Sequence, residues 1–126
     1  MAGTCLIVDD EAGIGWALGR LLSRAGFGVE VAGTAAGAVE RVKSRRYSTI
    51  FLDVKLPDGD GFDLAKDLGG LTKETPIVML SAYYYADDLK VRQALSQKLV
   101  CRFVPKPFRH GEILRLLQQL GVNPLP

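Results

Sequence analysis

The stretch CLIVDDEAG, residues 5–13, contains the pattern that decides the fold. Four apolar residues that should be buried run directly into three acidic ones. A short apolar run that ends so abruptly is typical of a strand buried on both faces of a sheet. Paired carboxylates at the tip of such a strand need a physical reason, because two like charges about 4 Å apart repel by about 4 kcal/mol at an effective dielectric of about 20.

Four further apolar runs of similar length follow, and stretches with helical spacing separate them. The five runs lie at residues 4–8, 29–32, 49–52, 77–80 and 100–104. We expect every run to be a strand buried on both faces. The helical stripes lie at residues 14–25, 35–42, 62–68, 86–95 and 113–120. This alternation predicts one α/β domain, a doubly wound parallel sheet with helices on both faces, in which Thr34 caps the second helix.

The composition of the 126-residue chain is that of a globular protein with one domain. Hydrophobic residues make up 48% and charged residues 24%, so the chain can build a core without disulfides or metals. The formal net charge of +2 is too small to indicate nucleic-acid binding. The sequence has neither an apolar run of roughly 20 residues nor the pattern of a signal peptide. We therefore expect a cytoplasmic protein that binds no membrane.

The cysteines and the single histidine argue against a transition-metal site. Cys5 and Cys101 lie in apolar, strand-like runs, which indicates two buried free thiols. His110 has no cysteine or histidine partner at a spacing typical of metal ligands.

Chemically active side chains follow four of the five predicted strands. Asp9 and Asp10 follow the first strand, and Asp53 follows the third. Ser81 follows the fourth and Lys106 the fifth. Because ligands of an open parallel sheet bind outside the carboxyl ends of its strands, we expect these five side chains to meet at one edge. Taken singly, each has a plainer interpretation: a turn former, a helix cap or a surface lysine.

Three carboxylates at one edge can relieve their repulsion by taking up a proton, by pairing with Lys106 or by binding a cation. A site made of oxygen ligands favours Mg2+, which leaves room for a phosphate. Asp53 could then attack a phosphoryl group as a nucleophile. Mg2+ and the Lys106 ammonium would neutralise charge on the transferred group, and the Ser81 hydroxyl could donate a hydrogen bond to it.

With these residues in place, the chain resembles the receiver domains of two-component response regulators, which belong to the CheY-like superfamily. The resemblance covers about residues 4–120 and is carried by LIVDDE (6–11), IFLDVKLPDGDGFDL (50–64), IVMLSA (77–82) and FVPKPF (103–108). It implies a flavodoxin-like (βα)5 fold with strand order 2-1-3-4-5. We expect the receiver domain at residues 1–121 and a tail, or the start of a linker, at residues 122–126.

The resemblance also implies the roles of the acidic residues. Asp53 would accept phosphate from the phosphohistidine of a sensor histidine kinase. Asp9 and Asp10 would bind Mg2+, with Asp10 and Asp53 as direct ligands and Asp9 acting through water. The backbone carbonyl of Lys55 would be a further ligand. Such a receiver catalyses only its own phosphorylation and dephosphorylation.

Further roles follow for residues around the phosphoryl group. Ser81 and Lys106 would bind it. Phe103 occupies the position of a switch aromatic, which turns inward when Ser81 moves toward the phosphate; an ordinary core aromatic is the alternative. The Lys106–Pro107 peptide bond would be cis, which costs an X-Pro bond only about 0.5–1 kcal/mol.

A narrower similarity concerns the output of the switch. GIGWALGRLL (13–22) and the proline before Lys106 are similar to receivers of the nitrogen-regulation class of enhancer-binding activators. In that class an ATPase and a DNA-binding domain follow the receiver, and neither is present in this sequence. The expected partners are a histidine kinase and a downstream output domain, and a homodimer is left open.

One region departs from the family pattern. The stretch between Ser81 and Lys106 is a few residues longer than usual, and Leu99-Val100 replaces the Gly-Ala that commonly closes the fourth helix. The fourth helix and fifth strand form the usual output face of the family. Three tyrosines, Tyr83, Tyr84 and Tyr85, crowd the start of that helix. One interpretation is that they form a modified partner surface or a cover over the site. The other is ordinary packing, with one packed ring and two exposed rings.

Two other functions compete with the switch. One is an enzyme of the same fold, a phosphohydrolase or a nucleotide or flavin protein. The acidic loop after the first strand would repel a bare phosphate, and no insertion is long enough for a substrate lid. The other is a docking module that binds its partner without phosphorylation.

Overall fold

The computed structural model describes residues 3–126 and shows a parallel five-stranded sheet. The strands, in spatial order, are β2 (Gly28–Ala32), β1 (Thr4–Val8), β3 (Thr49–Asp53), β6 (Ile77–Ser81) and β7 (Arg102–Pro105). Every neighbouring pair is parallel. Counted along the chain, this is the predicted order 2-1-3-4-5, so the flavodoxin-like fold is confirmed. A short antiparallel hairpin, β4 (Lys55–Leu56) and β5 (Gly59–Asp60), was not predicted.

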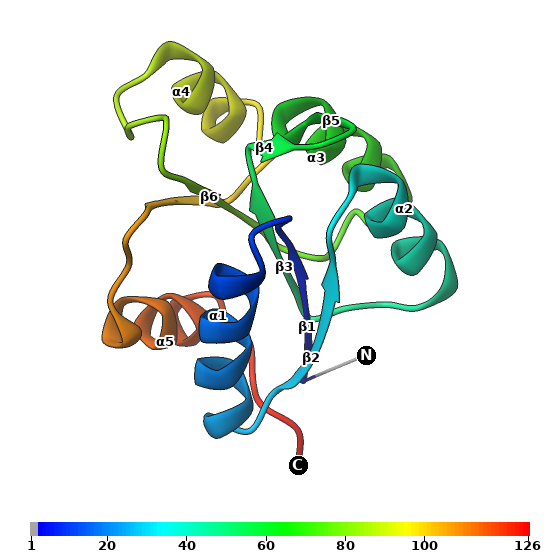
Figure 1. Ribbon diagram of the computed structural model, residues 1–126, viewed down its shortest axis with the longest axis vertical. Coiled ribbons are helices and arrows are strands. Elements are labelled where there is room, and N and C mark those ends of the chain that lie inside the picture. The colour runs from blue at the N-terminus through cyan, green and yellow to red at the C-terminus, as the bar shows by residue number, and fades with distance from the viewer. Residues whose placement is uncertain (1–2) are drawn as a thin grey trace.

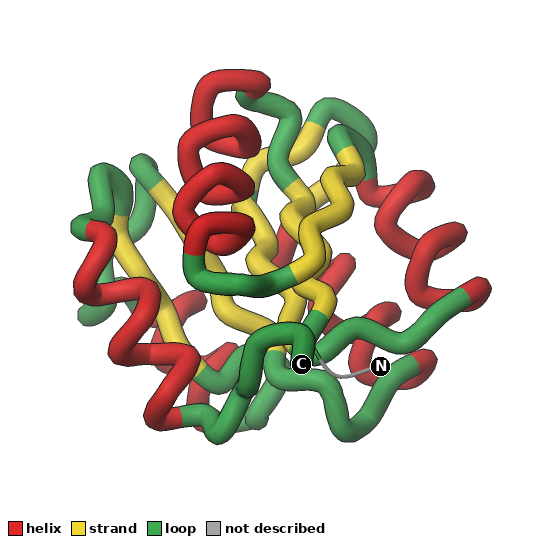
Figure 2. Tube along the Cα trace, turned by 90° about the horizontal axis from the view of Figure 1, so that it is seen from below, coloured by secondary structure: helices red, strands yellow, loops and turns green. Residues whose placement is uncertain are grey.

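Five helices cover the two faces of the sheet. They are α1 (Ala12–Arg24), α2 (Ala35–Ser44), α3 (Gly61–Leu71), α4 (Leu89–Ser96) and α5 (His110–Gln119). Figure 1 shows α1 and α5 together on one side and α2 and α3 on the other. Figure 2 shows the strands between these layers of helices. Among the described residues, no helix is long and apolar enough to cross a membrane.

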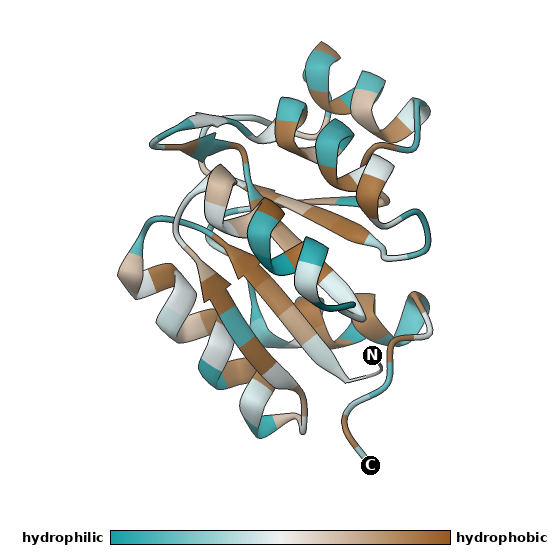
Figure 3. Cartoon of the chain, turned by 90° about the vertical axis from the view of Figure 1, so that its right-hand side faces the viewer, coloured by the Kyte–Doolittle hydropathy of each residue, from teal (hydrophilic) through white to brown (hydrophobic). Residues whose placement is uncertain are grey.

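Alternation along the strands builds two separate cores. Cys5, Ile7 and Phe51 belong to the core under α1 and α5. Leu6 and Val8 belong to the core under α2 and α3. Successive side chains of a strand point to opposite faces, which explains why neighbouring residues enter different cores. The apolar strands in the interior of the sheet stand out in Figure 3.

The prediction that all five strands are buried on both faces was wrong for the edges. The three central strands are buried at every position, whereas β2 and β7 each contain half-buried and exposed residues. An edge strand has a neighbour on one side only, so less of its surface is covered. Cys101, just before β7, is likewise half-buried, whereas Cys5 is buried; both thiols are free.

The second helix begins as predicted, but the fourth does not. Thr34 caps α2, since its Oγ1 atom accepts a hydrogen bond of 2.9 Å from the backbone N–H of Gly37. The predicted stripe of α4 was wrong: Ala86 precedes the helix and Leu89 is 68% exposed. Because α4 begins only at Leu89, Val91 and Ala94 form its buried face instead.

The end of α4 accommodates the missing glycine through Lys98. Lys98 has a φ of 60°, in the left-handed region that favours glycine. Its N–H donates to the Leu95 carbonyl at 3.1 Å, and the N–H of Leu99 donates to the Ala94 carbonyl at 2.9 Å. These two hydrogen bonds form a Schellman motif. The altered sequence thus still ends the helix in the usual way, with the left-handed Lys98 directly before the Leu99-Val100 pair.

Candidate functional site

Three carboxylates meet at the carboxyl edge of the sheet. Val8 of β1 pairs in register with Leu52 of β3, so the residues that follow them, Asp9 and Asp53, come side by side. Asp10 is the next residue along the chain. Asp9 and Asp53 are buried and Asp10 is exposed, and one oxygen of each carboxylate lies within 4.8 Å of the others. The predicted convergence of the acidic residues is present in the fold.

Lys106 brings the balancing positive charge from the end of β7. Its Nζ atom lies 2.8 Å from Oδ2 of Asp9, 3.5 Å from Oδ1 of Asp53 and 3.7 Å from Oε1 of Glu11. The Lys106 side chain is only 5% exposed. Its backbone N–H donates to the Ser81 carbonyl at 2.8 Å, which ties the segment after β7 to β6.

The peptide bond between Lys106 and Pro107 is cis.

Glu11 was not assigned a role from the sequence, although it continues the acidic run. Glu11 lies beside Lys106 only because the Lys106 side chain extends from the end of β7 toward the end of β1.

Burial and charge shift the pKa values of two of these groups. Burial raises the pKa of Asp53 to about 6; Lys106 opposes this shift and Asp9 adds to it. Burial disfavours the Lys106 ammonium, but the hydrogen bond with Asp9 and the nearby carboxylates outweigh it and raise the pKa of Lys106. The lysine therefore stays charged at neutral pH, and Asp53 is mostly ionised there.

The acidic cluster fits a small, hard cation. Mg2+ binds oxygen at about 2.1 Å in an octahedron, so oxygens on opposite sides of the ion lie about 4.2 Å apart. The three carboxylate oxygens lie within 4.8 Å of one another, so they can surround one ion if they move inward or if one of them binds through a water molecule. One lysine cannot neutralise this many carboxylates, so a divalent cation would relieve the remaining repulsion.

Ser81 ends β6, next to the strand that carries Asp53. Leu80, which precedes it, pairs in register with Asp53. The buried Ser81 Oγ atom accepts hydrogen bonds from the backbone N–H groups of Tyr83 (2.9 Å) and Tyr84 (3.1 Å). A hydroxyl can still donate its hydrogen when both acceptor positions are used. Ser81 therefore orders the loop before α4 and keeps one donor for a ligand oxygen.

Phe103 lies in β7, in register with Met79. Its half-buried ring packs against the core that includes side chains of α3 and α4. The position is compatible with a core aromatic and with a ring that changes place, so the predicted switch role stays a prediction.

The three tyrosines form one packed and two exposed rings. Tyr84 is half-buried and meets Phe62 edge-on at a centroid distance of 5.4 Å. Tyr83 is 63% exposed and Tyr85 71%. The Nζ atom of Lys55 lies 4.0 Å from the centroid of the Tyr83 ring, a cation–π contact between the start of β4 and the loop before α4. Nothing in the sequence pattern pointed to this contact.

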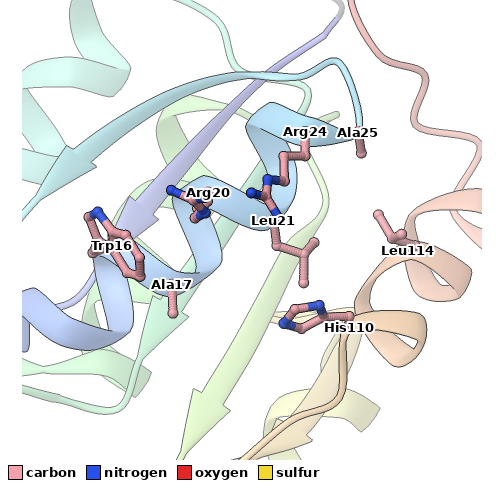
Figure 4. A pocket seen from close by; sticks show the side chains of 8 residues that line it. All are labelled: Trp16, Ala17, Arg20, Leu21, Arg24, Ala25, His110 and Leu114. Carbon is pink, nitrogen blue, oxygen red and sulfur yellow. The ribbon is translucent and has the colours of Figure 1, made fainter.

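A groove runs along α1 and the start of α5. It has a volume of about 420 Å3 and is lined by Trp16, Arg20, Arg24, His110 and Leu114, among others. Figure 4 shows these side chains along the two helices. Trp16 is 65% exposed, and the Arg20 guanidinium lies 5.3 Å from its ring centroid. The groove thus combines an exposed aromatic ring with several basic groups.

A flavodoxin-like sheet with an acidic cluster and a buried lysine at its carboxyl edge defines the CheY-like class. The chain belongs to the response regulator receiver domain family, which it matches over residues 5–118. It is 32% identical over 120 residues to the response regulator MprA of Mycobacterium tuberculosis, covering 95% of this chain and 51% of MprA. It is 28% identical over 123 residues to NtrC of a Bradyrhizobium species, covering 98% of this chain and 25% of NtrC. The chain thus spans about half the length of MprA and a quarter of NtrC.

Solved structures of receivers have the same fold. A CheY-like receiver from Methanospirillum hungatei superposes with a TM-score of 0.87 at 23% identity, covering 96% of this chain and 95% of that one. The response regulator TrrA from Thermotoga maritima, solved with Mg2+-BeF, superposes with a TM-score of 0.81 at 27% identity, covering 95% and 99%.

Proposed function

We propose that this receiver is a phosphorylation switch in which Asp53 accepts a phosphoryl group from a phosphohistidine of a sensor histidine kinase. The observation that carries the proposal is the convergence of three carboxylates with the buried Lys106 at one edge of the sheet. Asp53 is buried and mostly ionised at neutral pH, as a carboxylate nucleophile must be.

Mg2+ would be held by Asp10 and Asp53 directly, by Asp9 through water and by the backbone carbonyl of Lys55. When bound, the ion supplies positive charge beside the transferring group. The complex of TrrA with Mg2+-BeF supports this choice of ion.

The chain's own groups would complete the reaction. An Asp53 oxygen attacks phosphorus while the bond from phosphorus to the histidine nitrogen breaks. The Lys106 ammonium, already 3.5 Å from Asp53, would pair with a phosphoryl oxygen. Ser81 would donate its hydroxyl hydrogen to another phosphoryl oxygen. No reaction on another substrate is proposed.

The output would be a shift between two conformations. A phosphoryl group shifts their populations only by the difference in its affinity for the two. Movement of Ser81 toward the phosphate would free the Tyr83 and Tyr84 amides that it now binds, and Phe103 would turn inward. A longer parent protein would carry the output domain, as an ATPase with a DNA-binding domain in the nitrogen-regulation class, on a tail or linker beginning at residue 122.

The α1–α5 groove is our candidate surface for the kinase. α1 begins at Ala12, directly after the acidic residues, so a helix lying in this groove could bring its phosphohistidine to Asp53. Exposed tryptophan and arginine are the residue types that dominate binding energy at interfaces. We expect Trp16→Ala to slow phosphotransfer from a histidine kinase that phosphorylates the wild-type domain. Labelling by acetyl phosphate, which needs no docking surface, should not change.

Mass spectrometry after incubation with acetyl phosphate and Mg2+ tests the switch. The expected result is an adduct of about 80 Da, one phosphoryl group, that Asp53→Asn abolishes and that EDTA prevents. Asp67→Asn, which changes an exposed carboxylate on α3, is the matched control and should be labelled like the wild type. Failure of every phosphodonor to label the domain would favour the docking module instead.

A further inference from the structure

Asp58, in the turn of the β4–β5 hairpin, binds the N-terminus of α2. Its Oδ1 atom accepts a hydrogen bond of 2.7 Å from the backbone N–H of Ala35. Its Oδ2 atom accepts one of 3.0 Å from the N–H of Ala36. Asp58 is 23 and 22 positions away from these residues. The contact is therefore a helix cap supplied by a distant segment of the chain.

This cap completes the first turn of α2. The first N–H groups of a helix have no partner within the helix, and the positive end of its dipole favours an anion there. Thr34 accepts from Gly37 through its hydroxyl and from Ala38 through its carbonyl. Asp58 satisfies the two N–H groups that remain, and these hydrogen bonds lower the pKa of its carboxyl.

The other end of the hairpin is packed against the phosphorylation site. β4 begins at Lys55, two positions after Asp53, and Lys55 pairs with Asp60 across the hairpin. The N–H of Gly61 donates to the Val54 carbonyl at 2.6 Å. A Cβ atom at Gly61 would lie 2.5 Å from the backbone oxygen of Asp53. Because the hairpin is packed this closely at Gly61, it cannot move without also displacing the Lys55 carbonyl.

We propose that Asp58 is a positioning residue of the metal site: by binding α2, it holds the hairpin that carries the Lys55 carbonyl. The inference rests on the proposed function, because it requires Mg2+ to bind this cluster. Coupling between two sites is reciprocal. Mg2+ therefore strengthens the Asp58 cap by the same factor by which the cap strengthens Mg2+ binding.

Magnesium titrations of three variants, followed by Trp16 fluorescence and amide NMR shifts, test this coupling. In Asp58→Ala we expect the Mg2+ affinity to fall about fivefold, the lower end of the usual range for coupled sites. Asp58→Asn keeps a side-chain acceptor and should lose less. Thr34→Ala is the matched control, since it removes a cap from the same turn without touching the hairpin. Its Mg2+ affinity should equal that of the wild type.

Hydrogen exchange supplies the reciprocal measurement. Saturating Mg2+ should slow exchange of the Ala35 and Ala36 amides in the wild type and have no such effect in Asp58→Ala. Equal Mg2+ affinity in the wild type and Asp58→Ala, or an equal loss in Thr34→Ala, would overturn the positioning role. A wild-type domain that binds no Mg2+ would overturn the proposed metal site as well, so the two failures are distinguishable.

Discussion

Lys106 donates a hydrogen bond of 2.8 Å from its Nζ atom to Oδ2 of Asp9, although 97 positions separate the two residues. Both side chains are almost fully buried. The pair joins the segment after β1 to the segment after β7, at the edge of the sheet where the acidic cluster lies. The balance of charge between this lysine and the buried carboxylates leads to the first two predictions.

Replacing Lys106 with methionine should destabilise the domain at neutral pH. The substitution keeps a long apolar side chain but leaves Asp9 and Asp53 buried without their cation. Removing one partner of a buried ion pair costs about 3–5 kcal/mol of unfolding free energy, and urea unfolding would measure the loss. Mg2+ should restore part of it. Lys73→Met, which removes an exposed lysine far from this pair in the sequence, should change stability by less than about 0.5 kcal/mol.

Asp53 should make the domain less stable as the pH rises from about 4 to about 6. Its pKa is raised from 3.8 to about 6 in the folded state, so the folded protein binds the proton more tightly than the unfolded chain does. Above that pH range, the loss of unfolding free energy is at most about 3 kcal/mol. Urea unfolding of the wild type and Asp53→Asn at both pH values isolates this contribution. A difference between the two proteins that stays constant with pH would contradict it.

Breaking the contact between Lys55 and Tyr83 should shorten the lifetime of the proposed aspartyl phosphate at Asp53. The contact joins the start of β4 to the loop before α4, and we expect it to limit the approach of water to Asp53. An exposed cation–π contact is worth about 0.5–1 kcal/mol, so Tyr83→Ala should speed hydrolysis about two- to fivefold. Tyr85→Ala is the control, because Tyr85 is similarly exposed. Decay of the phosphorylated mass gives both rates, and equal rates would count against a shielding role.

Lys98→Gly should stabilise the domain. Lys98 ends α4 with a φ of 60°, a conformation that costs a residue with a Cβ atom about 1 kcal/mol relative to glycine. We expect a gain of about 0.5–1 kcal/mol in unfolding free energy, measured by urea denaturation. Gly26→Ala places a Cβ at a φ of 95° and should destabilise. A loss of stability in Lys98→Gly would show that the lysine side chain makes a compensating contact.

Thr49→Val should be neutral or stabilising. Thr49 is fully buried in β3, and its Oγ1 atom has no hydrogen-bond partner among the described residues. An unsatisfied buried hydroxyl costs about 1–3 kcal/mol, and valine has nearly the same shape. Thermal unfolding would detect a gain of this size. Thr75→Val is the contrasting case, because its hydroxyl donates to the Tyr47 carbonyl at 3.1 Å, and it should destabilise.

The central strands and the members of the acidic cluster could be predicted because their signals are local. A run such as Cys5 to Val8 is apolar throughout, and the order of parallel strands brings its acidic tip beside Asp53. The face of α4 could not be predicted in this way. Its apolar residues are too few to set the phase of the helix, and the loop that ends at Asp88 decides where the helix begins.

The sequence by itself determined the alternation of strands and helices, the parallel sheet and the set of residues at its carboxyl edge, because hydropathy and spacing act within one segment. Only the tertiary structure decided which side chains from distant segments meet. The distances from Lys106 to the carboxylates, the contact of Lys55 with Tyr83 and the cap of α2 by Asp58 all depend on how whole elements pack. No short stretch of sequence encodes such a distance, because each one is the sum of many packing contacts.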